Sequence, residues 1–232
     1  MSAATLTLAR YSRPIGQVWA FAQMGLARRP LRRAAGLTFF KLMGSGAGAG
    51  FLPVPNPTVW SILCGWRDAD AAAAGLRGGV FARWERRADE CCHLVLDPVS
   101  VRGLWSGRAP FAAGPDPGRG PIAALTRARI RPRALPRFWR RVPRLDRLVG
   151  GNDEVLMKVG VGEVPWLHQV TFSVWPDAAA MARFARDPAG PHAAAIRAVR
   201  AEGWFAEELY ARFRVRDARG IWQGRDIGET LT

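Results

Sequence analysis

Apolar and polar residues along this 232-residue chain follow two periods, one of two residues and one typical of helices. Alternation with a period of two is typical of strands, as are short apolar runs rich in β-branched and aromatic residues. Glycine and proline bound most of these runs. The pattern predicts eight strands, at 5–11, 37–43, 59–66, 95–101, 122–131, 155–162, 167–175 and 209–215.

Helical spacing fills the intervals between the predicted strands. A helix should begin at Pro14, because proline suits the first turn, and should stop at Gly36. Its apolar positions share one face, as in a helix that packs on a core, and these are Ile15, Val18, Trp19, Ala22 and Leu26. Asp68 and Asp70 can cap one further helix and Asp177 another, and residues 132–149 are also predicted to be helical.

The second half of the chain repeats the first. Four segments match in order, at offsets of 119, 117, 109 and 117 residues. The matched pairs are 6–10 with 125–129, 41–46 with 158–163, 65–69 with 174–178 and 104–108 with 221–225. The only two lysines, Lys41 and Lys158, open the second pair. An extra loop in the first copy, at 47–57, explains the smallest offset.

Each half therefore has the order βαββαβ, which describes the ferredoxin-like unit. One face of such a sheet carries helices, and the other face is apolar and must be buried. Two such sheets can bury these faces by packing against each other. We expect an α+β fold, in which duplicated ferredoxin-like units form a dimeric-type α+β barrel within one chain. The predicted parts are a first repeat at 1–109, a Pro/Gly-rich linker at 110–121 and a second repeat at 122–232.

Charge narrows the choice of partners. The net charge is +15, almost all from arginine, and such an excess favours an anionic partner. Two arginine clusters lie on corresponding predicted helices, at 28–33 and 137–147, and aromatic residues are interleaved with the second. This pattern suits an anionic membrane surface, with a merely solvated basic face as the alternative. We expect no nucleic-acid partner, because no recognised nucleic-acid module is present.

Several classes of site are missing from the sequence. The most apolar window, 51–66, contains three prolines and is too short to span a bilayer. Three cysteines, two of them adjacent, make no disulfide framework and indicate a reducing compartment, and no Cys/His spacing suits zinc. The glycine-rich stretch 44–50 lacks the lysine and helix of a phosphate-binding loop, so we expect a flexible loop.

A site used once should appear as a difference between the two copies, and the three histidines are such differences. His192 lies opposite Phe81, His168 lies opposite Val59, and His93 has no histidine counterpart. A neutral imidazole on a helix, facing a sheet across an apolar pocket, is a usual ligand of heme iron. For His192 the alternative is packing at a helix start, and for His168 it is a hydrogen-bonded core histidine. We expect His93 to be structural.

Motifs along nearly the whole chain resemble the spheroidene monooxygenase family, the acyclic carotenoid ketolases of phototrophic bacteria. The matching segments are 19–24, 40–46, 51–56, 100–103, 105–107, 167–173, 190–193 and, as the longest, 198–215. The sequence differs from the family pattern mainly at the linker, at 70–92 and at the C-terminal tail. His93 does not belong to the pattern, which agrees with a structural role.

The resemblance implies a heme-dependent monooxygenase that uses O2 to introduce a keto group into acyclic carotenoids. Two hydroxylations of one carbon would form a geminal diol, which loses water to give the ketone. By analogy with other heme proteins built on duplicated barrels, heme b would lie in the second repeat, with His192 as the metal ligand. His168 and Gln169 would be the catalytic residues, and Arg200 and Trp204 would help to bind the cofactor.

The same resemblance implies partners. A carotenoid substrate calls for peripheral contact with an anionic membrane surface, in a cytoplasmic protein, and the electrons would come from a ferredoxin-type donor. The segment 51–55 is a candidate apolar gate at the pocket mouth. The alternatives are a non-catalytic heme carrier or sensor, a metal-free carotenoid-binding protein, or another heme chemistry on the same fold. The sequence leaves the oligomeric state open.

Overall fold

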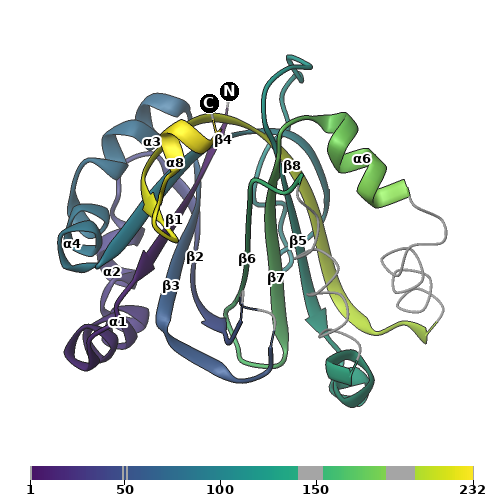
Figure 1. Cartoon of the computed structure of the whole chain (residues 1–232), viewed down its shortest axis with the longest axis horizontal. Coiled ribbons are helices and arrows are strands. Elements are labelled where there is room, and N and C mark those ends of the chain that lie inside the picture. Colours follow the sequence, from purple (N-terminus) through teal and green to yellow (C-terminus); the bar gives the residue numbers. More distant parts are fainter. Residues whose placement is uncertain (1, 49, 51, 141–153, 187–201, 232) are drawn as a thin grey trace.

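Eight antiparallel strands form a closed barrel with helices outside it (Figure 1). The computed structural model describes residues 2–48, 50, 52–140, 154–186 and 202–231. The strands follow the order β4-β1-β3-β2-β6-β7-β5-β8, and the pairing of β4 with β8 closes the ring. The predicted α+β class is confirmed.

All eight predicted strands are present, and their ends differ from the predicted ones by a few residues. The strands are β1 Ala3–Arg10, β2 Leu37–Gly46, β3 Pro55–Trp66, β4 Glu90–Gly103, β5 Ile122–Ile130, β6 Met157–Gly162, β7 His168–Trp175 and β8 Phe205–Trp222, with a short β9 at Arg225–Asp226. The largest difference is in β8, which is longer at both ends because it pairs with β5 and then with β4.

The helices cover the outer faces of the sheet. They are α1 Pro14–Leu26, α2 Arg28–Arg32, α3 Ala69–Leu76, α4 Gly79–Arg87, the 3-10 turn η1 Pro132–Ala134, α6 Ala178–Arg186 and α8 Ile227–Leu231. Residues 135–140 are also helical, and the rest of the predicted helix 132–149 lies outside the described residues. Two of the predicted caps are confirmed: Asp68 accepts a hydrogen bond from the Ala71 amide at 2.8 Å, and Asp177 from the Ala180 amide at 2.7 Å. Asp70 lies in the first turn of α3 instead.

Three predictions for the first half need correction. The helix predicted to begin at Pro14 is two helices, α1 and α2. Its supposed core face is mostly exposed, since Ile15, Val18, Ala22 and Leu26 face solvent and only Trp19 packs inward, against Tyr11 and Trp84. The stretch 44–50 is only partly a loop, since Gly44 to Gly46 belong to β2.

Strand register follows the sequence repeat. Leu6 lies opposite Leu63 in the first half and Leu125 opposite Phe172 in the second, which reproduces the offsets of 119 and 109. The lysine match is wrong by one residue. Lys41 pairs with Leu63, whereas Lys158 pairs with Ser173. The two lysines therefore point to opposite faces of the sheet, because successive side chains in a strand alternate.

The two halves also bind each other through matching turns. Glu207 on β8 accepts hydrogen bonds from the Ser106 and Gly107 amides, each at 2.9 Å. Its counterpart Glu90 on β4 accepts from the Gln223 and Gly224 amides at 3.2 and 2.9 Å. All four turn residues have positive φ, between 54° and 76°. Each glutamate thus fixes the turn that ends the other half's long strand.

The main core fills the barrel and joins both halves. Strand residues from both halves form one buried cluster, including Leu8 and Phe172. The predicted linker is packed against this barrel: Phe111 contacts Phe213 with ring centroids 5.2 Å apart, and Asp116 pairs with the buried Arg214 at 2.6 Å. A second cluster lies between the outer face of the first half and helices α1 to α4.

Candidate functional site

A cavity of about 620 Å³ opens at the seam between the halves. Its walls come from α1, from the β2–β3 connection and from the β6–β7 turn, and its lining is largely apolar. The apolar lining includes Val18, Phe21, Met24, Leu42, Leu52, Pro53, Val54, Trp60, Trp139, Val161, Val164 and Trp166, and the polar lining includes Gln17, Glu163, His168 and Gln169. A concave apolar space with a few polar groups is typical of a small-molecule site.

The seam is open because β2 and β6 pair over only two positions. Gly44 lies opposite Gly162, and Ser45 opposite Val161. Gly162 is required at the turn into β7, since a Cβ there would stand 2.2 Å from the His168 carbonyl oxygen. Beyond this short ladder the two hairpins diverge, and the cavity occupies the space between them.

Three indole groups in the lining of the cavity donate hydrogen bonds to backbone carbonyls, and one of these bonds joins the two halves. The Trp166 Nε1 donates to the Pro53 carbonyl at 2.7 Å, and the Trp139 Nε1 donates to the Trp166 carbonyl at 3.1 Å. The Trp60 Nε1 donates to the Pro57 carbonyl at 2.7 Å, and its ring packs edge-on against Phe21. Leu52 to Pro55, which belong to the segment predicted as an apolar gate, line the cavity; Phe51 lies outside the described residues.

A half-buried carboxylate, that of Glu163, closes the polar end of the cavity. Glu163 accepts hydrogen bonds from Lys41 Nζ at 2.7 Å and Trp105 Nε1 at 2.6 Å, and its Oε2 lies 3.5 Å from His168 Nδ1. Burial by itself would raise the pKa of Glu163, but these three donors outweigh it and lower the pKa to about 2. Glu163 is thus ionised at neutral pH and faces the imidazole of His168.

Two of the predicted catalytic residues come together at this cavity. His168 shares the inward strand face of Val170 and Phe172, as the alternation predicts, while Gln169 points to the outer face. The Nε2 of Gln169 is buried and has no hydrogen-bond partner in the described part of the chain. Among the residues that the structure describes, His168 Nδ1 contacts only Glu163, at 3.5 Å, which is long for a hydrogen bond.

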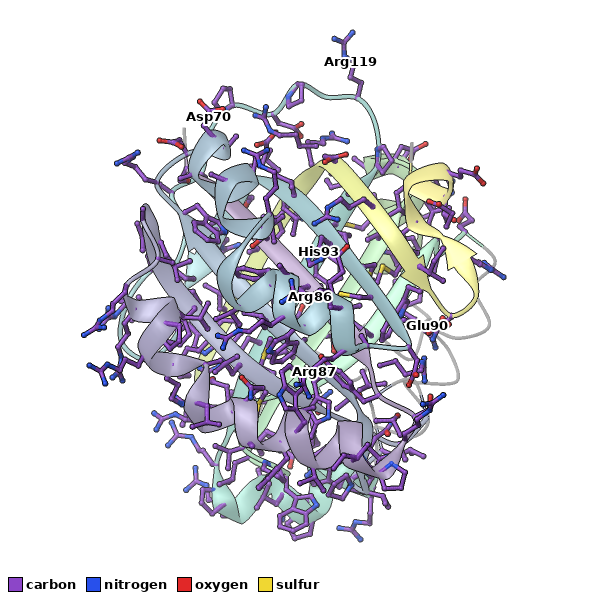
Figure 2. The ribbon with its side chains drawn as sticks, turned by 90° about the vertical axis from the view of Figure 1, so that its left-hand side faces the viewer. Asp70, Arg86, Arg87, Glu90, His93 and Arg119 are labelled. Atoms are coloured by element: carbon purple, nitrogen blue, oxygen red, sulfur yellow. The ribbon has the colours of Figure 1, made fainter. Side chains whose placement is uncertain are left out.

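The other predicted residues do not join them. Trp204 is buried with Ile130 and Phe138, donates to Glu202 at 2.9 Å, and lines a separate cavity of about 270 Å³. His192 and Arg200 lie outside the described residues. His93 is buried in the sheet behind α4 and lies 2.8 Å from the Thr7 hydroxyl, in keeping with a structural role (Figure 2).

Sequence reasoning missed Glu163, Lys41 and Trp105 as site residues. Trp105 lies between cations, with Lys41 Nζ 5.7 Å and Arg127 Cζ 5.4 Å from its ring centroid. One signal could have found the lysine, because only two lysines occur in this arginine-rich chain. The contact with Glu163 could not be found, since the two residues are 122 positions apart.

The outer faces of the two halves differ in a way that bears on a cofactor. In the first half Trp60, Ile62 and Cys64 fill the space beneath the helices. The residues at the same register in the second half are Gln169, Thr171 and Ser173. Leu42 is likewise replaced by Gly160, which pairs with Thr171 as Leu42 pairs with Ile62. The second half thus carries a floor of small and polar side chains where the first half carries a packed core.

The described side chains do not form a metal site by themselves. Across 2–48, 50, 52–140, 154–186 and 202–231, no three His, Cys, Asp or Glu residues are grouped as metal ligands would be. A single axial ligand to a porphyrin does not need such a group.

Comparison with known proteins identifies the family. No family model matches the chain. It is 46% identical over 231 residues to the spheroidene monooxygenase of Rhodobacter capsulatus, covering 97% of this chain and 95% of that protein. The spheroidene monooxygenase of Cereibacter sphaeroides is 44% identical over 235 residues, covering all of this chain and 72% of that protein. The enzyme of the same name from Rubrivivax gelatinosus is 36% identical, with coverage of 93% and 83%.

Solved structures support the fold alone. An aldoxime dehydratase superposes with a TM-score of 0.62 at 12% identity, over 92% of this chain and 81% of that one. A second aldoxime dehydratase, in complex with butyraldoxime, gives a TM-score of 0.59 at 10% identity, over 92% and 79%. The sequence relatives are close enough, over enough of both chains, to decide membership. The chain belongs to the spheroidene monooxygenase family.

Proposed function

We propose that this protein is a heme-dependent monooxygenase that introduces a keto group into acyclic carotenoids. The observation that carries the proposal is the apolar cavity at the seam, with Gln169 and His168 in its wall. A linear carotenoid end is long, narrow and apolar, and such a cavity would hold it and exclude water. The sequence relatives, which bear the name spheroidene monooxygenase, point to the same substrate class.

The residues present suit a porphyrin in the second half. Thr171, Ser173 and Gly160 leave room on the outer face, where the first half has Ile62, Cys64 and Leu42. His192 would supply the metal ligand, with Arg200 and Trp204 as further contacts. The cavity beside Trp204 is lined by arginines, including Arg133 and Arg140, and suits the carboxylates of such a cofactor. When bound, heme b would supply the activation of O2 that side chains cannot provide.

The chain's own residues would position an oxygen atom in the cavity and supply protons to it. The Glu163 carboxylate favours a proton on Nδ1 of His168, which leaves the Nε2 lone pair as an acceptor. The unpaired Gln169 amide would donate to an oxygen atom in the cavity. Each hydroxylation consumes one O2, two electrons and two protons, converts one C–H into C–OH and releases one water. A second round at the same carbon gives the geminal diol, which loses water to form the ketone.

We further infer that the two halves arose by duplication of a ferredoxin-like unit, with parts at 1–109, 110–121 and 122–232. Both halves have the same strand order, β4-β1-β3-β2 and β8-β5-β7-β6. The paired registers and the matching glutamate-bound turns support the inference. The proposed electron donor is a small acidic protein of the ferredoxin type, which the net charge of +15 would attract.

An absorption spectrum of the purified protein tests the cofactor. A Soret band is expected, and His192→Ala should lose it while the far-ultraviolet circular dichroism is kept; His93→Gln is the matched control and should keep both. Loss of the band in His168→Ala alone would reverse the ligand assignment. Oxygen-dependent conversion of spheroidene by protein plus reductant tests the reaction. Protein that is free of iron after expression with ample heme would contradict the proposal.

A further inference from the structure

Helix α1 presents its apolar face to solvent. Ile15, Val18, Phe21 and Leu26 are between 67 and 78% exposed. The residues that α1 buries most completely are Ala20 and Gln23. A surface helix of a globular protein normally buries its large apolar side chains and exposes its polar ones. In α1 only Trp19 and Met24 of the large apolar side chains pack against the protein's core. The four exposed ones form a second apolar face, which indicates that this face is covered by something other than that core.

The positive charge around α1 favours an anionic binding partner. The 13 residues of the helix include no charged side chain. Arg13 precedes the helix, and Arg28, Arg29, Arg32 and Arg33 follow it, all of them exposed. Asp68 is the first acidic residue of the whole sequence. Within the described part of the chain, Arg13 and the arginines at 28–33 have no acidic partner.

The exposed face continues into the rim of the seam cavity. Val18 and Phe21 line the cavity, and so do the exposed side chains of Val54, Val164 and Trp166. Seven of the nine large apolar side chains exposed in the described regions lie on α1 or on this rim. Figure 1 shows α1, the β2–β3 connection and the β6–β7 turn at the same lower end of the barrel.

We propose that this end of the barrel inserts into the surface of an anionic bilayer, with α1 lying in the plane of the interface. An interfacial helix buries its apolar face roughly 5–10 Å deep, and arginines at its ends reach the lipid phosphates. No helix in the described ranges is long and apolar enough to cross the bilayer. The contact therefore places the cavity mouth among the acyl chains, where a carotenoid is dissolved.

Lipid fits this surface better than a protein partner does. An acidic protein would pair with the arginines but would leave the uncharged α1 face uncovered, and a second copy would bring arginines against arginines. The inference rests on the proposed function only in that membrane binding would serve to deliver the carotenoid substrate. Membrane binding itself can be measured without turnover.

Vesicle flotation with the full chain tests the contact. Vesicles of phosphatidylcholine alone are compared with vesicles containing phosphatidylglycerol, and the wild type should partition strongly into the anionic set. The double variant Ile15→Asn/Leu26→Asn changes two exposed residues that do not line the cavity. It should weaken partition by about 10-fold or more. Arg29→Gln/Arg33→Gln should weaken binding to anionic vesicles about 5- to 30-fold and binding to neutral ones little.

The matched control is Ile221→Asn, an exposed apolar residue in the β8–β9 hairpin, which should leave partition unchanged. Turnover of detergent-dispersed carotenoid should be normal in Ile15→Asn/Leu26→Asn, which separates failed docking from failed catalysis. The inference is overturned if wild type does not bind anionic vesicles. It is also overturned if the Ile15/Leu26 variant binds as well as wild type, or if that variant instead abolishes a dimer seen by ultracentrifugation.

Discussion

Trp60 and Gln169 occupy the same register position in the two halves, each opposite an alanine of the neighbouring strand, Ala9 or Ala128. Trp60 fills its position and packs against Phe21 from α1. Gln169 leaves its amide nitrogen buried and unpaired in the described structure, in the wall of the same cavity. One position thus serves packing in the first half and leaves room for a ligand in the second.

A tryptophan at position 169, like Trp60 in the first half, should therefore fill the site while the protein still folds. In Gln169→Trp we expect an indole to occupy part of the cavity, so that carotenoid turnover falls at least about 10-fold while the thermal midpoint shifts by only a few degrees. Turnover of spheroidene and a thermal melt measure the two effects. Gln169→Asn, which keeps an amide and adds no volume, is the control. Full turnover in Gln169→Trp would show that this wall is not part of the substrate site.

The pKa of Glu163 predicts a pH-dependent contribution to stability. Its carboxyl has a pKa of about 2 in the folded protein and an ordinary value of 4.5. The stabilisation is therefore fully present above pH 4.5 and is lost as the pH falls toward 2. Glu163→Gln should lower the free energy of unfolding by about 2 kcal/mol at pH 7, because the half-buried Lys41 also loses its partner.

Urea unfolding at a series of pH values measures the effect. The difference between wild type and Glu163→Gln should shrink as the pH falls through 4 toward 3. Glu208→Gln, which changes an exposed glutamate of β8, is the control. A difference that stays constant from pH 7 to pH 3 would mean that the carboxylate charge is not what stabilises this end of the barrel.

His93 predicts a second, separate pH response. Burial lowers its pKa to about 4, and the nearby Arg219 guanidinium lowers it too, against the opposing carboxylate of Glu85. The unfolded chain takes up a proton near pH 6.5 and the folded chain does not, so stability falls as the pH drops from 6.5 to 4. The expected loss is about 2–3 kcal/mol.

In His93→Gln this loss should disappear, since glutamine does not titrate and can still accept the Thr7 hydroxyl. The slope of unfolding free energy between pH 7 and 5 is the measurement. An unchanged slope would place the titrating group elsewhere. Heme content should be the same in both proteins, because His93 lies outside the cavity lining.

The matching glutamates predict unequal effects on barrel closure. Glu207 holds two turn amides and Arg127, which is almost fully buried, whereas Glu90 holds two turn amides and the more exposed Arg10. Glu207→Ala should lower the free energy of unfolding by about 3 kcal/mol and Glu90→Ala by about 1–2 kcal/mol. Urea denaturation tests the ranking, and Glu208→Ala is the control. Equal losses would show that burial of the arginine is not decisive.

Local patterns were sufficient for much of the architecture. Periodicity predicted all eight strands and the capped helices, because side-chain alternation and caps depend on neighbours in sequence. The repeat predicted which strands correspond, and Val59 and His168 do share one register. The repeat itself failed by one position at Lys41 and Lys158, because a shared residue type does not record which face a side chain takes.

Sequence by itself determined the elements and the placement of His168 and Gln169 on opposite faces of one strand. Only the tertiary structure decided that Lys41 and Trp105 meet Glu163, that α1 turns its apolar face outward, and that a cavity opens where β2 and β6 part. The physical reason is that periodicity shows which residues share a face but not what that face meets. That outcome depends on barrel closure, which brings residues more than one hundred positions apart into contact.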